Sequence, residues 1–164
     1  MTIRQIAMER FSVASAKPFD QVATALAAAV GHPEMSSFGQ NIAAANNFSE
    51  VEAVVNKAAG RSGLLEFMRF DLGQVVSKQH GPKTPRSLRF LIGNPVIMKQ
   101  LLELVPDAGS YAPVTILIDE RADGVHLSYD TMAGFLAPYN NPQALKIATD
   151  LDQKVVALLS AVAA

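Results

Sequence analysis

The residues of this sequence that could do chemistry are few and lie far apart. The chain has three histidines, His32, His80 and His126, and no cysteine. Imidazole titrates near neutral pH, so His126 could serve as a general base or contact a ligand, with Asp130 or Glu66 as the partner carboxylate. The other interpretation is an exposed histidine on a strand, because no second histidine or carboxylate stands at a spacing that forces contact with it.

Other kinds of site are excluded or disfavoured by the residue types. A chain without cysteine has no disulfide, no thiolate nucleophile and no Cys-ligated zinc or iron–sulfur site. The three histidines follow no recognisable ligand spacing, so we expect neither a metal nor a cofactor. The run Gly93-Asn94-Pro95 resembles an anion site at a helix start, but it lacks the usual glycine run and Pro95 removes one N–H donor. We interpret it as helix capping.

Length and composition narrow the class of protein. With 164 residues and 49% hydrophobic content, the chain suits a single domain over 1–164 with a sizeable core. A formal net charge of -1, with 18% charged residues, gives no footprint for nucleic acid. Arg4, Glu9 and Arg10 interrupt the N-terminus, and no apolar run approaches the roughly 20 residues of a spanning helix. We therefore expect a cytoplasmic protein that binds neither membranes nor nucleic acid.

The stretch from Ser87 to Asp130 predicts a complete run of elements. Strands are expected at Ser87–Ile92, Val114–Ile118 and Val125–Asp130, where apolar residues alternate with others or β-branched residues gather. Asn94-Pro95 begins a helix that extends to Val105, and the polar loop 119–124 ends in Asp-Gly, which favours a hairpin. We expect the three strands in one sheet, with this helix on the face that carries Leu88, Phe90, Ile116 and Leu127.

The rest of the chain adds two strands and four helices. Strands are predicted over 3–16 and 64–72, and helices over 18–31, 33–46, 47–60 and from Asn141-Pro142 to Val162. Residues 77–86 read as a loop and residues 131–140 as irregular. The expected fold is a two-layer α+β domain, an antiparallel or mixed sheet covered by helices.

The second face of the predicted sheet is the main candidate for function. The alternating pattern places these residues on it: Leu65, Phe67, Arg69, Asp71, Arg89, Leu91, Thr115, Leu117, His126 and Ser128. The row is too apolar for free solvent and too polar for a core. It could be a cleft in which Arg69 and Arg89 hold an acidic group, or a subunit interface, which we favour.

Two further residues bear on that choice. Tyr111, which precedes the Val114 strand, either closes a pocket over the sheet or fills the core. Glu66 is either an edge carboxylate or a buried acid. The candidate ligand contacts are therefore Arg69, Arg89, Tyr111, Thr115 and His126, and no catalytic residue is assigned.

Several of these segments resemble the domain-of-unknown-function 302 family. The resemblance rests on Gly93-Asn94-Pro95, the run 106–113, the strand 114–120 and the hairpin 123–129, and it is best from Gly63 onward. It implies an α+β fold with an antiparallel sheet covered by helices, commonly self-associated, and it implies no reaction. We therefore hypothesise a non-catalytic homodimeric module that binds a partner or a small acidic or apolar ligand. The alternative is a small hydrolase or isomerase-like enzyme that uses His126 with a carboxylate.

Overall fold

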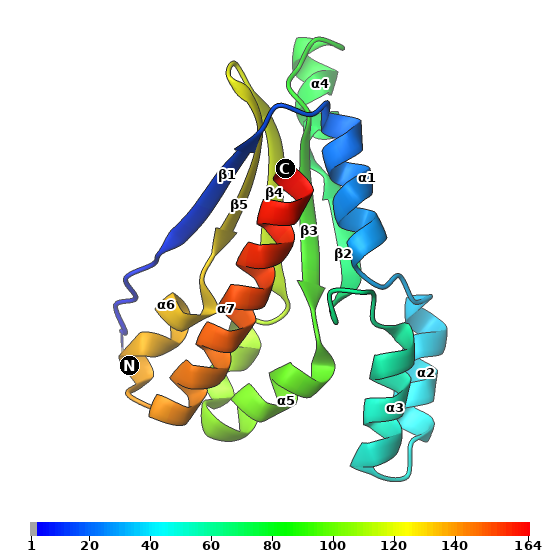
Figure 1. Ribbon diagram of the computed structural model, residues 1–164, viewed down its shortest axis with the longest axis vertical. Helices are drawn as coiled ribbons and strands as arrows, with labels where there is room; N and C mark the ends of the chain where they lie inside the picture. Colours follow the sequence, from blue (N-terminus) through cyan, green and yellow to red (C-terminus); the bar gives the residue numbers. More distant parts are fainter. Residues whose placement is uncertain (1–2) are drawn as a thin grey trace.

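The computed structural model describes residues 3–164, which are organised around one five-stranded sheet (Figure 1). The strands are β1 Arg10–Ser15, β2 Leu65–Asp71, β3 Ser87–Gly93, β4 Val114–Arg121 and β5 Gly124–Asp130. Their order across the sheet is β1-β5-β4-β3-β2, and every neighbouring pair is antiparallel. The α+β class predicted from the sequence is confirmed, and the sheet is antiparallel rather than mixed.

The helices lie mainly on one side of this sheet. They are α1 Phe19–Ala29, α2 Met35–Ala44, α3 Phe48–Ala58, α4 Leu72–His80, α5 Pro95–Leu104, α6 Met132–Leu136 and α7 Pro142–Ala163, with 3-10 turns η1 Pro106–Ser110 and η2 Ala137–Tyr139. The two helices α1 and α7 cover one face, and α2 and α3 form a hairpin at the end of β2 (Figure 1). Within the described residues, no helix covers the opposite face of β3, β4 and β5.

The covered face carries the core that the alternating pattern predicted. Phe90 lies opposite Ile116, and Ile118 lies opposite Leu127. All four side chains are fully buried. The three predicted strands do share one sheet, and the face assignment for them is confirmed.

The helix that we predicted on this face does not cover it. We expected α5 to lie on it, but α5 packs against α7 and lies across the end of the sheet (Figure 1). Asn94 begins the helix directly after Gly93 ends β3, so there is no loop to carry the helix back over the strand. The 22 residues of α7 span about 33 Å at 1.5 Å per residue, long enough to cover the strands instead.

The predicted helix starts are confirmed where asparagine caps them. The side-chain oxygen of Asn94 accepts from Val96 N at 2.8 Å, and that of Asn141 accepts from Ala144 N at 3.0 Å. Asn47 caps α3 in the same way through Glu50 N at 3.0 Å. Each side chain satisfies first-turn N–H groups that have no partner within the helix.

Four predicted boundaries are wrong. The first strand is Arg10–Ser15 and not the whole of 3–16, because only these residues pair with β5. The predicted loop 77–86 begins as helix, since α4 extends to His80 after Asp71 caps it. The predicted loop 119–124 shrinks to Ala122 and Asp123 because β4 continues to Arg121. The region 131–140, expected to be irregular, forms α6 and η2.

A β-bulge in β2 reverses the predicted faces of its second half. Glu66 pairs with Ile92, but Met68 pairs with Leu91, so Phe67 is an extra residue in the ladder. Directly paired residues share a face, and an inserted residue shifts that alternation by one. Beyond the bulge, Arg69 and Asp71 therefore lie on the covered face, and Met68 and Phe70 replace them on the other.

A buried carboxylate joins β5, α6 and α7. Asp152 is the most deeply buried acidic or basic residue among 3–164, with 8% of its surface exposed. It accepts from Tyr129 Oη at 2.6 Å, from Met132 N at 2.8 Å and from Ala133 N at 2.9 Å. Burial is the main reason why the pKa of Tyr129 is raised far above its usual value, so this phenol stays a donor.

The contrast between the two faces of β4 gives a first test. Ile116→Ala should lower the free energy of unfolding by roughly 2–5 kcal/mol, because a fully buried side chain leaves a cavity. Thr115→Ala should cost far less, because Thr115 is only half-buried on the other face. Urea denaturation of both variants checks the order, and a larger loss for Thr115→Ala would mean that the faces are reversed.

The buried carboxylate gives a second test with a control on the same helix. Asp152→Asn replaces one acceptor oxygen by an NH₂ group that faces N–H donors, so it should cost about 1–3 kcal/mol of unfolding free energy. Asp150→Asn removes only an exposed pair with Lys146 and should cost less than about 0.5 kcal/mol. Equal losses in thermal and urea unfolding would show that Asp152 does not hold this junction.

Candidate functional site

The uncovered side of the sheet, which we call the open face, holds the candidate site. Its residues follow from the register: Arg10, Ser12, Ala14, Met68, Phe70, Arg89, Leu91, Thr115, Leu117, Asp119, His126, Ser128 and Asp130. A hollow of about 500 Å³ opens at the end of this face nearest α6. Arg89, Thr115 and Tyr111, three of the predicted ligand contacts, all line it. This volume falls within the range of small-molecule sites.

Two stacked aromatic rings form one wall of the hollow. Tyr111 and Phe135 lie parallel, with ring centroids 4.5 Å apart and 10° between their planes. The Tyr111 hydroxyl lies 3.0 Å from that of Tyr139, which donates to Asp107 at 2.9 Å. Because a phenol has one proton and the carboxylate only accepts, Tyr111 must donate to Tyr139. The hydrogen bond with Tyr111 is also the largest cause of the raised pKa of Tyr139.

Of the charged side chains around the hollow, one is paired within the chain and one is not. Asp130 is gripped by Arg10 through bonds of 2.6 and 2.8 Å, which lower its pKa and neutralise its charge. Arg89 donates only to Thr115 Oγ1, at 3.3 Å, and has no carboxylate partner among the described residues. The hollow therefore presents one uncompensated positive charge to a ligand.

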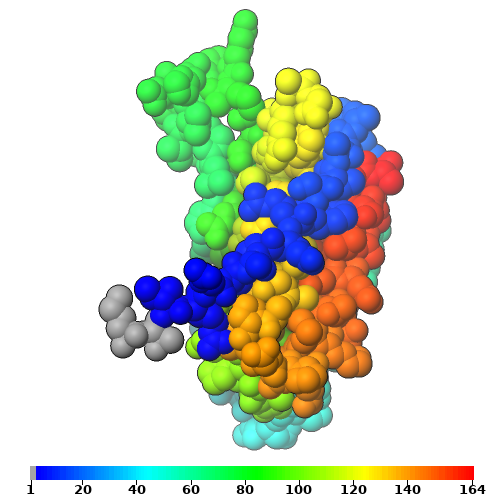
Figure 2. Space-filling model, turned by 90° about the vertical axis from the view of Figure 1, so that its left-hand side faces the viewer, coloured from blue at the N-terminus to red at the C-terminus, as the bar shows by residue number. Residues whose placement is uncertain are grey.

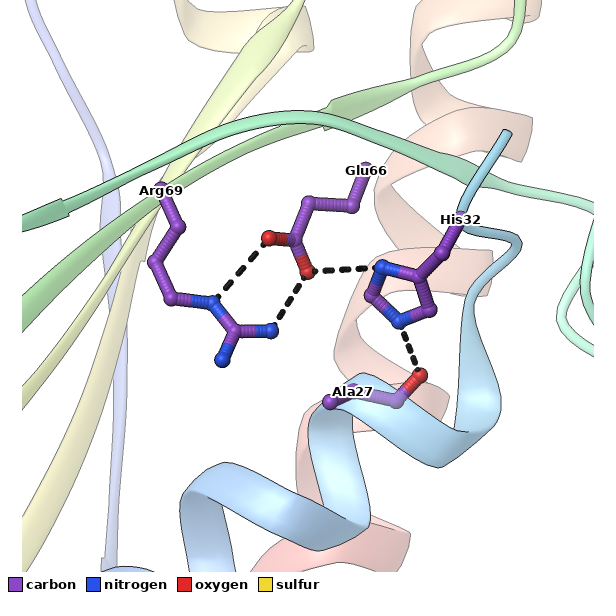
Figure 3. Close-up of polar contacts among 4 residues, drawn as sticks. All are labelled: Ala27, His32, Glu66 and Arg69. Carbon is purple, nitrogen blue, oxygen red and sulfur yellow. Dashed lines mark hydrogen bonds and ion pairs between the residues drawn. The ribbon is translucent and has the colours of Figure 1, made fainter. Parts of the chain in front are cut away.

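Arg69, also a predicted ligand contact, lies elsewhere because of the bulge. It grips Glu66 with two bonds, Nε to Oε1 at 3.0 Å and Nη2 to Oε2 at 2.8 Å (Figure 3). Its guanidinium also lies 4.5 Å from the Phe90 ring centroid, on the covered face. The side chain of Glu66 is 10% exposed, so the carboxylate is largely buried and is held by an arginine fork. This pair is structural support for the edge of the sheet.

The same carboxylate faces His32. Glu66 Oε2 lies 3.3 Å from His32 Nδ1, and His32 Nε2 lies 2.7 Å from the carbonyl oxygen of Ala27 (Figure 3). A carbonyl only accepts, so Nε2 carries a proton, and the contact with Glu66 is an ion pair when Nδ1 is protonated too. No sequence spacing linked His32 to Glu66, because the two residues come from segments that meet only in the fold.

Two glycines allow the segments that carry His32 and Glu66 to approach each other closely. Gly31 N donates to Leu64 O at 2.8 Å, and Glu66 N donates to Gly31 O at 2.8 Å, so residue 31 forms a parallel bridge at the edge of β2. A Cβ on Gly31 would overlap the carbonyl oxygen of Ala58, and one on Gly60 would lie 2.4 Å from Val30 C. The close backbone approach therefore requires glycine.

His126, the remaining candidate, is at the far end of the open face. Its Nε2 lies 2.9 Å from Asp123 Oδ1, and this bond is the main cause of the lowered pKa of Asp123. The Asp123 side chain is 73% exposed at the hairpin turn. Asp130 and Glu66, the partners considered from the sequence, are held by arginines instead. His126 is not among the residues that line the hollow at the α6 end of the open face.

Sequence reasoning missed part of the hollow. Phe135 lies in a region expected to be irregular, and nothing in its local pattern pointed to Tyr111. Asp107 and Tyr139, which fix the Tyr111 hydroxyl, come from two turns that the α5–α7 packing brings together. Within residues 3–164, no three His, Asp or Glu side chains gather as metal ligands would. No helix of this part has the length and apolar character to cross a membrane.

Fold and site together define a two-layer α+β domain with helices on one face and a ligand-sized hollow on the other. The family model described as "Domain of unknown function DUF302" matches residues 40–162. The chain belongs to this family, and the match begins in α2, earlier than the region from Gly63 that carried the resemblance best.

One solved structure supports the same fold. The chain is similar to the crystal structure of an uncharacterized conserved DUF302 protein from Bacillus stearothermophilus, with a TM-score of 0.66 and 12% sequence identity. The alignment covers 96% of this chain and 100% of that one. At this identity the likeness concerns the fold alone. A comparison with curated proteins found no match.

The glycine that positions His32 gives a third test. Gly31→Ala should destabilise the chain by about 1–3 kcal/mol, because the added methyl group collides with backbone of residue 58. Gly39→Ala in α2 is the matched control, since nothing lies within 4 Å of its Cβ position. That change should be neutral or stabilise by up to about 1 kcal/mol through helix propensity. If both variants unfold alike in urea, the close approach is not required.

Proposed function

We propose that this chain is a non-catalytic binding module, with residues 1–164 as one domain, that pairs with a second copy through the open face. The observation that carries this proposal is the uneven cover of the sheet. The covered face is buried beneath α1 and α7, whereas Leu91 and Leu117 on the open face are only partly shielded. Exposed apolar surface of this kind is typical of protein interfaces.

The exposed apolar residues concentrate beside this face. Ten large apolar side chains are exposed in the described chain, and five of them lie within residues 68–76: Met68, Phe70, Leu72, Val75 and Val76. Met68 and Phe70 lie on the open face, and the other three belong to α4, which follows directly. α4 projects from the body on the side away from α1 and α7 (Figure 2). A second copy seated on the open face would cover both groups.

Size and charge are compatible with a second copy as the occupant. Five strands about 4.8 Å apart and roughly six residues long make a face of about 500 Å² before side-chain relief is counted. With α4 added, this is of the order of the 800 Å² per partner in a standard interface. Asp119 and Asp130 on this face are each paired with an arginine of the same chain, so their charges do not oppose a second copy. The family resemblance carries the same expectation of self-association.

Binding is favoured over catalysis by how the ionisable groups are used. His126 pairs with the exposed Asp123, and Glu66 is held by Arg69. Neither lines the hollow of the open face, where a hydrolase would need its general base within hydrogen-bond reach of the nucleophile. The absence of cysteine, which suits a reducing compartment, supports the cytoplasm as the proposed location.

A pair of methionine variants tests the dimer. Wild-type protein should sediment at twice the mass of one chain, and Met68→Lys should shift dissociation to at least about tenfold higher concentration by placing a cation opposite Leu91 in the apolar part of the interface. Met35→Lys is the matched control, because Met35 is exposed on α2, away from the open face. A wild type that stays monomeric over the measured range, or equal effects of both variants, would contradict the proposal.

A further inference from the structure

The geometry points to a specific ligand class for the hollow on the open face: a small organic anion in which a carboxylate is attached to a flat apolar or aromatic body. This inference goes beyond self-association and does not depend on it. It rests on one free guanidinium, one aromatic wall and one neutralised acid, all of which border the same space.

The free guanidinium sets the charge of the ligand. Arg10, Arg69, Arg86 and Arg121 each grip a carboxylate of the chain at 2.6–2.8 Å. Arg89 differs, because its one hydrogen bond within the described residues is the 3.3 Å contact with Thr115. Most of its N–H donors are therefore available, and their fork geometry matches a carboxylate. A cationic ligand would have no free carboxylate to pair with here, since Asp130 is already paired with Arg10.

The aromatic wall sets the shape of the ligand. The stacked rings of Tyr111 and Phe135 border the hollow, with Leu91 and Pro113 beside them. Tyr111 donates its proton to Tyr139, away from any ligand, so this wall offers the hollow a ring and no free hydroxyl donor. A flat apolar body that lies against these residues removes their surface from water.

The arrangement is held in place before a ligand binds. Tyr111 is fixed by the chain of hydrogen bonds to Tyr139 and Asp107. Thr115 and Leu91 belong to two central strands, β4 and β3, where they pair directly. A site built on such elements loses little conformational entropy on binding.

Binding of benzoate, followed by amide chemical shifts of the ¹⁵N-labelled full chain, tests the inference. The expected result is shift changes that centre on residues 89–91, 110–115 and 135, with an affinity at least about tenfold tighter than for benzamide, which has the same shape without the charge. Acetate, which has the charge without the ring, should also bind at least several-fold more weakly than benzoate.

Arg89→Gln should weaken benzoate binding by about tenfold or more, because it removes the fork and keeps a polar chain on the strand. Arg61→Gln is the matched control, since Arg61 borders a different hollow beside α1 and α7. Repeating the titration on Val75→Lys separates the two proposals, because Val75 belongs to the exposed apolar group on α4 and does not line the hollow, so binding in that variant supports the anion site whatever the state of association. Equal affinities for benzoate and benzamide, unchanged binding by Arg89→Gln, or no binding up to about 10 mM would overturn the inference.

Discussion

The hydrogen bonds to Asp152 are the interaction on which much of the remaining structure depends. They fix the end of β5 through Tyr129 and the start of α6 through two backbone N–H groups. A five-residue helix is too short to be stable alone, so α6 owes its position to this carboxylate. α6 carries Phe135, the ring against which Tyr111 stacks. The wall of the hollow therefore depends on a buried acid on the opposite side of the sheet.

The second constraint is that the sheet has two faces, and the helices of this chain cover only one of them. α7 is long enough to run along the strands, and α1 completes the layer (Figure 1). α5, which begins directly after β3, lies across the end of the sheet instead. The open face and the apolar residues 68–76 are what this arrangement leaves uncovered. The surface at which we propose pairing and the hollow for which we propose a ligand both result from this lack of cover.

Local signals predicted most of the fold, and non-local contacts account for what they missed. Three helix starts could be predicted from their capping residues, Asn94, Asn141 and Asn47, because a cap bonds to residues close to it in the chain. Period-2 alternation likewise placed Phe90 and Ile116 together on the covered face. A bulge has no such signature, so the predicted face of Arg69 was wrong. The site was predicted in part: Arg89, Tyr111 and Thr115 do meet, but Phe135 joins them only through α6, which no local pattern predicted.

The bulge at Phe67 also decides which charged side chains lie on the open face. Without the extra residue, Arg69 would share the open face with Arg89, on the neighbouring strand. With the extra residue, Arg69 lies on the covered face. There its guanidinium is paired with Glu66 at the edge of the sheet. The open face near the hollow keeps a single uncompensated guanidinium. One fork suits one carboxylate, whereas two adjacent forks would suit a more highly charged group, so under our proposal a one-residue insertion sets the charge of the ligand.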